Sequence, residues 1–182
     1  SYRILLIGVA EGMQPLASKA YGASQNGNAT PAERIAAYDE IRHIRNKAIR
    51  TAIAASVLLF LFTIATASFY PALYGYQGDA AAAGYHAVML TAAQLIFTGI
   101  VRVTNSFFYA VGKNRYSLFM IYFDPLCLTP AALAVLPHFF GTDGIWLTAV
   151  ITQFLLNLVA AGMFVRHNAQ MKREQAALTK GV

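Results

Sequence analysis

Three ionisable side chains lie inside long apolar stretches of the sequence: Glu11, Arg102 and Asp124. A charge at the centre of a bilayer costs about 2.5–3.5 kcal/mol by insertion scales, so such groups usually face other helices or a water-filled cavity and mark functional sites. A protonatable acid beside a cavity is what proton coupling requires. These residues are therefore the first candidates for a functional site.

Arg102 belongs to a stripe of polar side chains that recur every three or four residues between Leu90 and Gly112. On an α-helix, this spacing places them on one face. The stripe consists of Thr91, Gln94, Thr98, Arg102, Asn105 and Tyr109. Either the guanidinium faces a cavity or substrate path, or its aliphatic stem reaches up to the inner headgroups. The shared polar face favours the cavity.

Glu11 and Asp124 each have two interpretations. Glu11 shares a helix face with Gln14, next to Pro15, which predicts a kink. It is either a proton-coupling acid or a neutral hydrogen-bonding group between helices. Asp124 either pairs with Arg102 or forms part of a helix break, where its carboxylate binds backbone donors freed by the following proline.

Catalytic and metal-binding motifs are missing from the sequence. The four histidines are scattered, there is no HExxH motif, and Cys127 is the only cysteine. There is also no G-x-x-x-x-G-K-[ST] loop for ATP. We therefore expect no enzyme activity, no metal and no cofactor. A transporter of this kind would use an ion gradient or a partner ATPase, and the coupling ion, sodium or proton, is not assigned.

The composition indicates a membrane protein. Of 182 residues, 57% are hydrophobic and only 12% are charged, against about 25% charged in soluble domains. The apolar stretches predict an all-α, polytopic membrane helix bundle with about five transmembrane helices. We expect a first helix over 1–22, a cytoplasmic loop and amphipathic lead-in over 23–47, four transmembrane helices over 48–165 and a cytoplasmic tail over 166–182. The four spans are expected at 48–73, 85–111, 116–140 and 145–165, the third of these broken by its prolines.

The basic residues set the orientation. The net charge is +6, and 12 of the 14 Lys and Arg fall on one side of the expected spans. By the positive-inside rule, we expect the C-terminal tail of this integral membrane protein to be cytoplasmic. This distribution favours a lipid bilayer over nucleic acid as the partner.

Three segments resemble the multidrug and toxic compound extrusion (MATE) transporters. The eighth of their twelve helices is similar to the segment GVAEGMQPLASKAYGASQNGN. The end of their tenth helix is similar to SFFYAVGKNRYS, and the join between their eleventh and twelfth helices is similar to LPHFFGTDGIWLTAVITQF. The matching positions are Gly12, Gln14, Pro15, Gly22, Ala23, Pro137, Gly141, Gly144, Ile145 and Trp146.

The resemblance implies that this chain is a partial C-terminal lobe, helices eight to twelve, of a two-lobed antiporter. Such a protein lies in the cell inner membrane and exports cationic or amphipathic drugs and toxic compounds in exchange for sodium or protons by alternating access. Its partners would be the N-terminal lobe and seventh helix of the same protein and small organic substrates. The candidate cavity residues are Gln94, Thr98, Arg102, Asn105, Tyr109, Glu11, Gln14 and Asp124.

Two departures from the family pattern affect this interpretation. An arginine is common in the family where this chain has Asp124, and the span that carries Arg102 offers no carboxylate for a coupling cation. Arg102 would also repel a cationic drug unless Asp124 or Glu11 compensates. The alternatives are a lipid-linked oligosaccharide flippase of the same superfamily, which needs more cavity cations, and a non-transporting membrane scaffold subunit.

Overall fold

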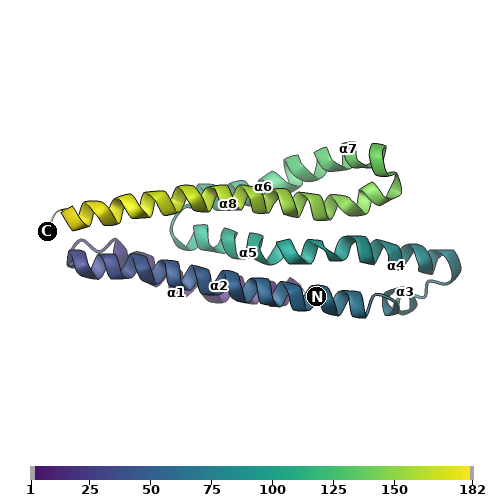
Figure 1. The fold of residues 1–182 in the computed structure, drawn as a ribbon, viewed down its shortest axis with the longest axis horizontal. Helices are drawn as coiled ribbons and strands as arrows, with labels where there is room; N and C mark the ends of the chain where they lie inside the picture. The colour runs from purple at the N-terminus through teal and green to yellow at the C-terminus, as the bar shows by residue number, and fades with distance from the viewer. Residues whose placement is uncertain (1–2, 181–182) are drawn as a thin grey trace.

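The computed structural model describes residues 3–180, and within that range every regular element is helical (Figure 1). The elements are α1 (Arg3–Ser24), α2 (Pro31–Ala65), α3 (Phe69–Leu73), α4 (Gly78–Ala92), α5 (Gln94–Ala110), α6 (Asn114–Phe123), the π-helix η1 (Asp124–Leu128), α7 (Thr129–Phe140) and α8 (Thr142–Lys180). The all-α prediction is confirmed. The helices run along one long axis, and α5 lies between α2 and α8 in Figure 1.

Several helices are long and apolar enough to cross a membrane. These are α2, the stretch Asn114–Phe140 and α8, and the bent pair of α4 and α5 is a fourth candidate. The expected first span, α1, has 22 residues but does not reach the same hydropathy, because it carries Glu11, Gln14 and Lys19 among its apolar residues. The structure therefore supports three or four spans, and the fifth remains a prediction.

Two helices continue well beyond the expected spans. The lead-in over 32–47 and the following span form one helix, α2, of 35 residues, which at about 1.5 Å per residue is about 52 Å long. The expected tail likewise continues α8 without a break to Lys180. A hydrocarbon core is about 30 Å thick, so about half of each helix extends outside it.

The start of α2 follows from its sequence. Thr30 and Glu33 form a capping box, in which Thr30 Oγ1 accepts from the Glu33 N–H at 3.3 Å and Glu33 Oε2 accepts from the Thr30 N–H at 2.8 Å. Pro31 occupies the first helical turn, where its missing N–H is not needed. At the other end, α2 stops at Ala65, and residues 69–73 form the separate α3. The span expected over 48–73 is thus shorter than predicted.

Two of the expected spans are interrupted. The helix expected over 85–111 begins earlier, at Gly78, and bends by 42° at Ala93, between α4 and α5. The span over 116–140 contains η1, where the Thr129 N–H bonds to the Asp124 carbonyl five residues back. Pro125 and Pro130 have no N–H to continue an α-helical pattern through this stretch. The prediction that this span is not a uniform helix is confirmed.

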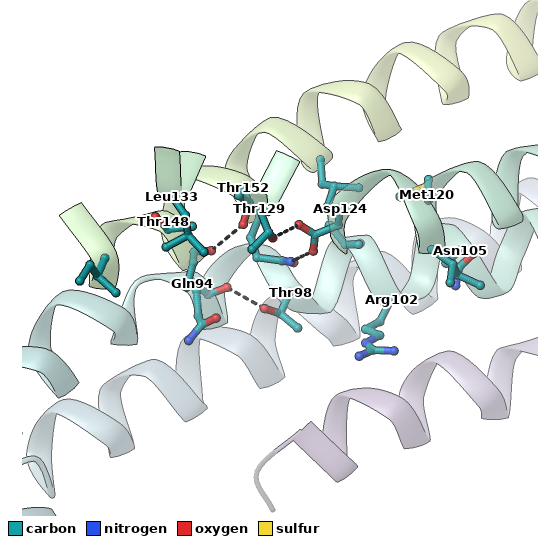
Figure 2. A pocket seen from close by; sticks show the side chains of 16 residues that line it. Gln94, Thr98, Arg102, Asn105, Met120, Asp124, Thr129, Leu133, Thr148 and Thr152 are labelled. Atoms are coloured by element: carbon teal, nitrogen blue, oxygen red, sulfur yellow. Dashed lines mark hydrogen bonds between the residues drawn. The ribbon is translucent and has the colours of Figure 1, made fainter. Parts of the chain in front are cut away.

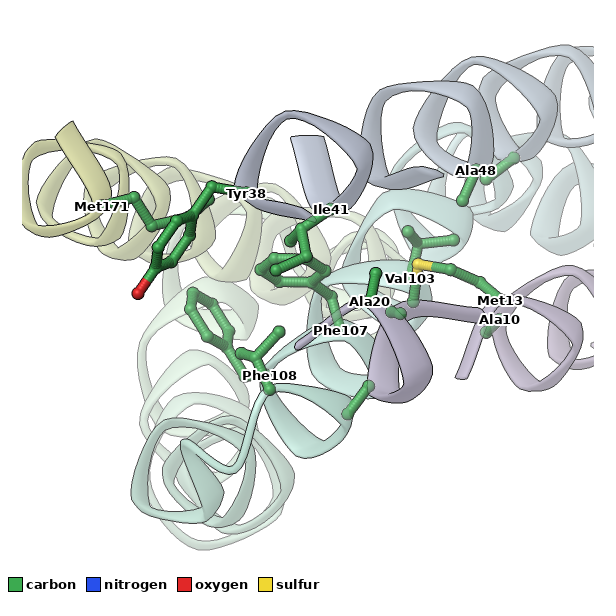
Figure 3. Close-up of a cluster of buried hydrophobic side chains, with 14 residues drawn as sticks. Ala10, Met13, Ala20, Tyr38, Ile41, Ala48, Val103, Phe107, Phe108 and Met171 are labelled. Carbon is green, nitrogen blue, oxygen red and sulfur yellow. The ribbon is translucent and has the colours of Figure 1, made fainter. Parts of the chain in front are cut away.

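The main hydrophobic core lies where α1, α2, α5 and α8 meet. Phe107 and Phe108 are fully buried there, together with Ile41 and Tyr38 of α2 (Figure 3). Small residues let the helices approach: Gly99 of α5 lies against Ala52 of α2, and α1 contributes alanines to the core. This packing fixes α5, the helix that carries the polar stripe.

Candidate functional site

A polar cavity of about 520 Å³ lies between α5, the η1–α7 segment and α8 (Figure 2). Its polar lining consists of Gln94, Thr98, Arg102, Asn105, Asp124, Thr129, Thr148, Thr152 and Gln153. Apolar side chains such as Met120, Leu133 and Leu156 complete the wall. The cavity thus combines apolar contact surface with hydrogen-bonding groups on helices of membrane-spanning length.

A second cavity, of about 350 Å³, lies between α1 and α5. Glu11 and Gln14 line it from α1, and Arg102 and Asn105 line it from α5. Because Arg102 and Asn105 also line the first cavity, they stand at the junction of the two. Seven of the eight residues predicted from sequence therefore line one or both of these cavities.

Tyr109 is the exception among the predicted residues. It lies outside both cavities, and 60% of its surface is exposed. The spacing from Asn105 places it near the same helix face, but the α5–α6 turn begins only two residues later, at Val111. Tyr109 is therefore not part of the lining that the other stripe residues form.

Neutral side chains hold the carboxylate of Asp124. Thr129 Oγ1 donates to its Oδ1 at 2.9 Å, and Gln153 Nε2 donates to its Oδ2 at 3.0 Å (Figure 2). Arg102 does not pair with it: the ion pairs found within residues 3–180 are Arg42–Asp39 and His86–Asp143. Asp124 thus lies at a helix break, as the second sequence interpretation has it, but the partners of its carboxylate are the side chains of Thr129 and Gln153 rather than Arg102 or freed backbone donors.

Arg102 points away from Asp124, toward α1 (Figure 2). In the described part of the chain, its guanidinium makes no ion pair and no hydrogen bond within the usual distances. The neighbouring Asn105 is engaged, because its Oδ1 accepts from Ser117 on α6. Arg102 therefore offers up to five free N–H donors at the junction of the cavities.

The threonines of the first cavity have fixed hydroxyl directions. Thr98 donates to the Gln94 carbonyl and Thr148 to the Gly144 carbonyl, both at 2.9 Å. With their protons used inside their own helices, these hydroxyls offer only acceptor lone pairs to a ligand. The wall between α5 and α8 is held by Asn157, whose Nδ2 donates to the Phe97 and Gln153 carbonyls at 3.0 and 2.8 Å.

Sequence reasoning missed the contribution of α8 to this site. Thr148, Thr152 and Gln153 all line the first cavity, as does Thr129 of α7. Thr148 and Thr152 are four residues apart and share a helix face, so a polar stripe of the same kind as that on α5 was visible in the sequence. Metal binding has no support here, because no group of three or more His, Cys, Asp or Glu side chains comes together within residues 3–180.

Fold and site together define an all-α protein that has membrane-length helices and two cavities with polar linings between its helices. Comparisons with protein-family models, curated proteins and solved structures gave no match. The resemblance to MATE transporters therefore rests on the three sequence segments and their order alone.

Proposed function

We propose that this protein is a secondary active transporter of amphipathic organic solutes, and that the chain forms part of the C-terminal lobe of a MATE-type exporter. The observation that carries the proposal is that Arg102 and Asn105 each line two cavities, of about 520 and 350 Å³, which lie on either side of α5. Ionisable groups that line cavities between membrane helices usually belong to a substrate or ion path. A transport role explains why this chain retains three of them.

The cavity walls suit alternating access. The bend of 42° between α4 and α5 and the π-helical η1 both lie beside the first cavity. Interrupted helices near the bilayer midplane form the binding sites of many secondary transporters, where rocking of one helix group against another exposes the site to each side in turn. Breaks of the regular helix at η1 and Ala93 are natural points for such motion.

An ion gradient is the proposed energy source. The sequence has no ATP-binding loop, and Glu11 and Asp124 are the acids that line the two cavities. Either acid could exchange a proton or a sodium ion during the cycle. The proposed location is the inner membrane, with the Arg- and Lys-rich C-terminal end of α8 in the cytoplasm.

The flippase alternative gains less support from the cavities. A site for a pyrophosphate needs several positive charges, and Arg102 is the one cation that lines either of these two cavities. The scaffold alternative predicts that the polar groups serve packing alone. An experiment that measures transport distinguishes a scaffold from a transporter, because both would show the same packed helices.

The test is an efflux assay with the full protein in proteoliposomes, at varied sodium and pH, with fluorescent amphiphiles of either charge: rhodamine 123 and carboxyfluorescein. Glu11→Gln, Arg102→Gln and Asp124→Asn remove charge with little change in size. We expect at least one of them to lower the efflux rate tenfold or more. Glu40→Gln, on the exposed face of α2, is the matched control. Unchanged efflux in all three cavity variants would favour the scaffold.

A further inference from the structure

The positive charge at the junction of the cavities is available to a ligand. Arg102 borders both cavities, and neither Asp124 nor Glu11 lies within 4 Å of its guanidinium nitrogens. Asp124 already accepts one hydrogen bond on each oxygen, from Thr129 and Gln153. Its charge is therefore stabilised locally, without help from Arg102.

The groups around Arg102 favour an anion over a cation. A cationic ligand at the junction would meet the guanidinium directly and would find the Asp124 oxygens already engaged. A carboxylate, sulfonate or phosphate can take two parallel N–H bonds from the planar guanidinium, a geometry that lysine cannot provide. Each cavity is also lined by one carboxylate, Asp124 in the first and Glu11 in the second. The Asp124 oxygens already accept bonds from Thr129 and Gln153. The anion is therefore best placed on the side of the first cavity, where Arg102 and the amide of Gln94 both line the wall.

We propose that Arg102 binds the anionic head group of an amphipathic substrate, whose apolar part lies along Met120, Leu133 and Leu156 in the first cavity. This inference rests on the proposed transport function and narrows its substrate class. The substrate is an organic anion, or a zwitterion that carries a carboxylate, sulfonate or phosphate. The cationic drugs that the family resemblance implies would bind less well.

The test uses two probes with the same apolar ring and chain and opposite head groups, 4-phenylbutanoate and 4-phenylbutylammonium. Each is titrated calorimetrically into the full chain in a non-ionic detergent. We expect 4-phenylbutanoate to bind at least tenfold more tightly than 4-phenylbutylammonium. Arg102→Gln should weaken 4-phenylbutanoate binding tenfold or more and leave the cation unchanged or slightly tighter, while Arg102→Lys should fall between.

Two further variants locate the binding. Arg50→Gln removes an exposed arginine of α2 that lines neither cavity, and it should leave both affinities unchanged. Leu133→Trp places a larger ring at a partly exposed position of the first cavity wall. It should weaken both probes, because it occupies the space that their phenyl rings need.

The possible results distinguish failure of the anion site from failure of the proposed transport function. If 4-phenylbutylammonium binds as tightly as 4-phenylbutanoate, or if Arg102→Gln changes neither affinity while Leu133→Trp weakens both, the anion site is overturned and a solute cavity remains. If neither probe binds saturably in any variant, the anion site is overturned and the transport proposal loses its cavity as well.

Discussion

Gln153 of α8 donates a hydrogen bond from Nε2 to Oδ2 of Asp124 over 3.0 Å, and so joins the longest helix of the chain to the π-helical segment η1. Thr129 donates to the other oxygen of the same carboxylate. A charge in an apolar stretch is thereby stabilised by neutral donors from two directions. The acid is held in place without an ion pair, and Arg102 is left free.

Gln153→Leu should therefore destabilise the protein. The substitution keeps the side-chain volume similar but leaves Oδ2 of Asp124 without its donor, which should lower the free energy of unfolding by about 1–3 kcal/mol. Asp124→Asn should have a smaller effect, because an amide can still bond to Thr129 and Gln153. Thermal unfolding in detergent measures both, and the double variant should lose less than the sum of the two. Gln14→Leu, in the second cavity, is the control, and equal losses in the control and Gln153→Leu would contradict the prediction.

The crossing of α2 and α5 depends on a glycine. A Cβ at Gly99 would collide with Ser56 Oγ and lie 3.0 Å from the Ala52 carbonyl oxygen. Gly99→Ala should therefore destabilise the protein by about 1–3 kcal/mol, as other overpacking substitutions do, despite the better helix propensity of alanine.

Ser56→Ala should restore much of that loss. Ser56 Oγ is fully buried and has no hydrogen-bond partner among the described residues, so its removal should be neutral or stabilising in the wild type. In the Gly99→Ala background it also removes the nearest colliding atom. Unfolding midpoints of the two single variants and the double variant form the cycle. If Ser56→Ala gives the same change in both backgrounds, the two residues do not collide as described.

The burial of His167 should make the stability of the protein depend on pH. His167 is 3% exposed, and neither ring nitrogen has a hydrogen-bond partner among residues 3–180. Burial, with a smaller contribution from the charges of Lys113 and Arg45, lowers its pKa from 6.5 to about 4. It lies two residues beyond the last expected span. The unfolded chain binds the proton more readily than the folded one, so the contribution of neutral His167 is complete above pH 6.5 and is lost as pH falls toward 4. The loss should reach roughly 3 kcal/mol.

His167→Phe should flatten this pH dependence. The imidazole packs edge-on against Phe107 and Phe108, so a phenyl ring suits the same space and brings no unpartnered nitrogen. Unfolding midpoints between pH 4 and 8 test this, with His43→Phe on the exposed face of α2 as the control. Wild-type and His167→Phe curves that stay parallel over this range would show that His167 does not titrate as described.

The polar face of α5 could be predicted because its signal is local. A repeat of three to four residues within one helix places Gln94, Thr98, Arg102 and Asn105 together whatever the neighbouring helices do, and the structure lines a cavity with all four. The prolines likewise predict a break near Asp124 without knowledge of the tertiary fold.

The partners of these residues could not be read in the same way. Asp124 and Gln153 are 29 residues apart, and their contact depends on how η1 and α8 pack. Whether Arg102 lies near Asp124 likewise depends on how α5 packs, and the buried Phe107 and Phe108 belong to that packing. The sequence predicts apolar spans that are shorter than α2 and α8. A change from apolar to charged residues marks the end of a membrane span, but it does not end a helix, because both compositions form helix readily.

The charged ends of α2 and α8 should stabilise each other through Tyr38. Its hydroxyl donates to Glu174 Oε2 at 2.7 Å and accepts from Gln25 at 3.0 Å, while the ring is almost fully buried. Tyr38→Phe keeps the ring and removes both bonds, which leaves a carboxylate without its donor. We expect a loss of about 1.5–3 kcal/mol in the free energy of unfolding, since one bond involves a charged partner. Tyr109→Phe, at an exposed ring on α5, removes a hydroxyl without such partners and should change the unfolding midpoint little. A Tyr38→Phe variant as stable as Tyr109→Phe would mean that the Tyr38 hydroxyl adds little to the packing of α2 against α8.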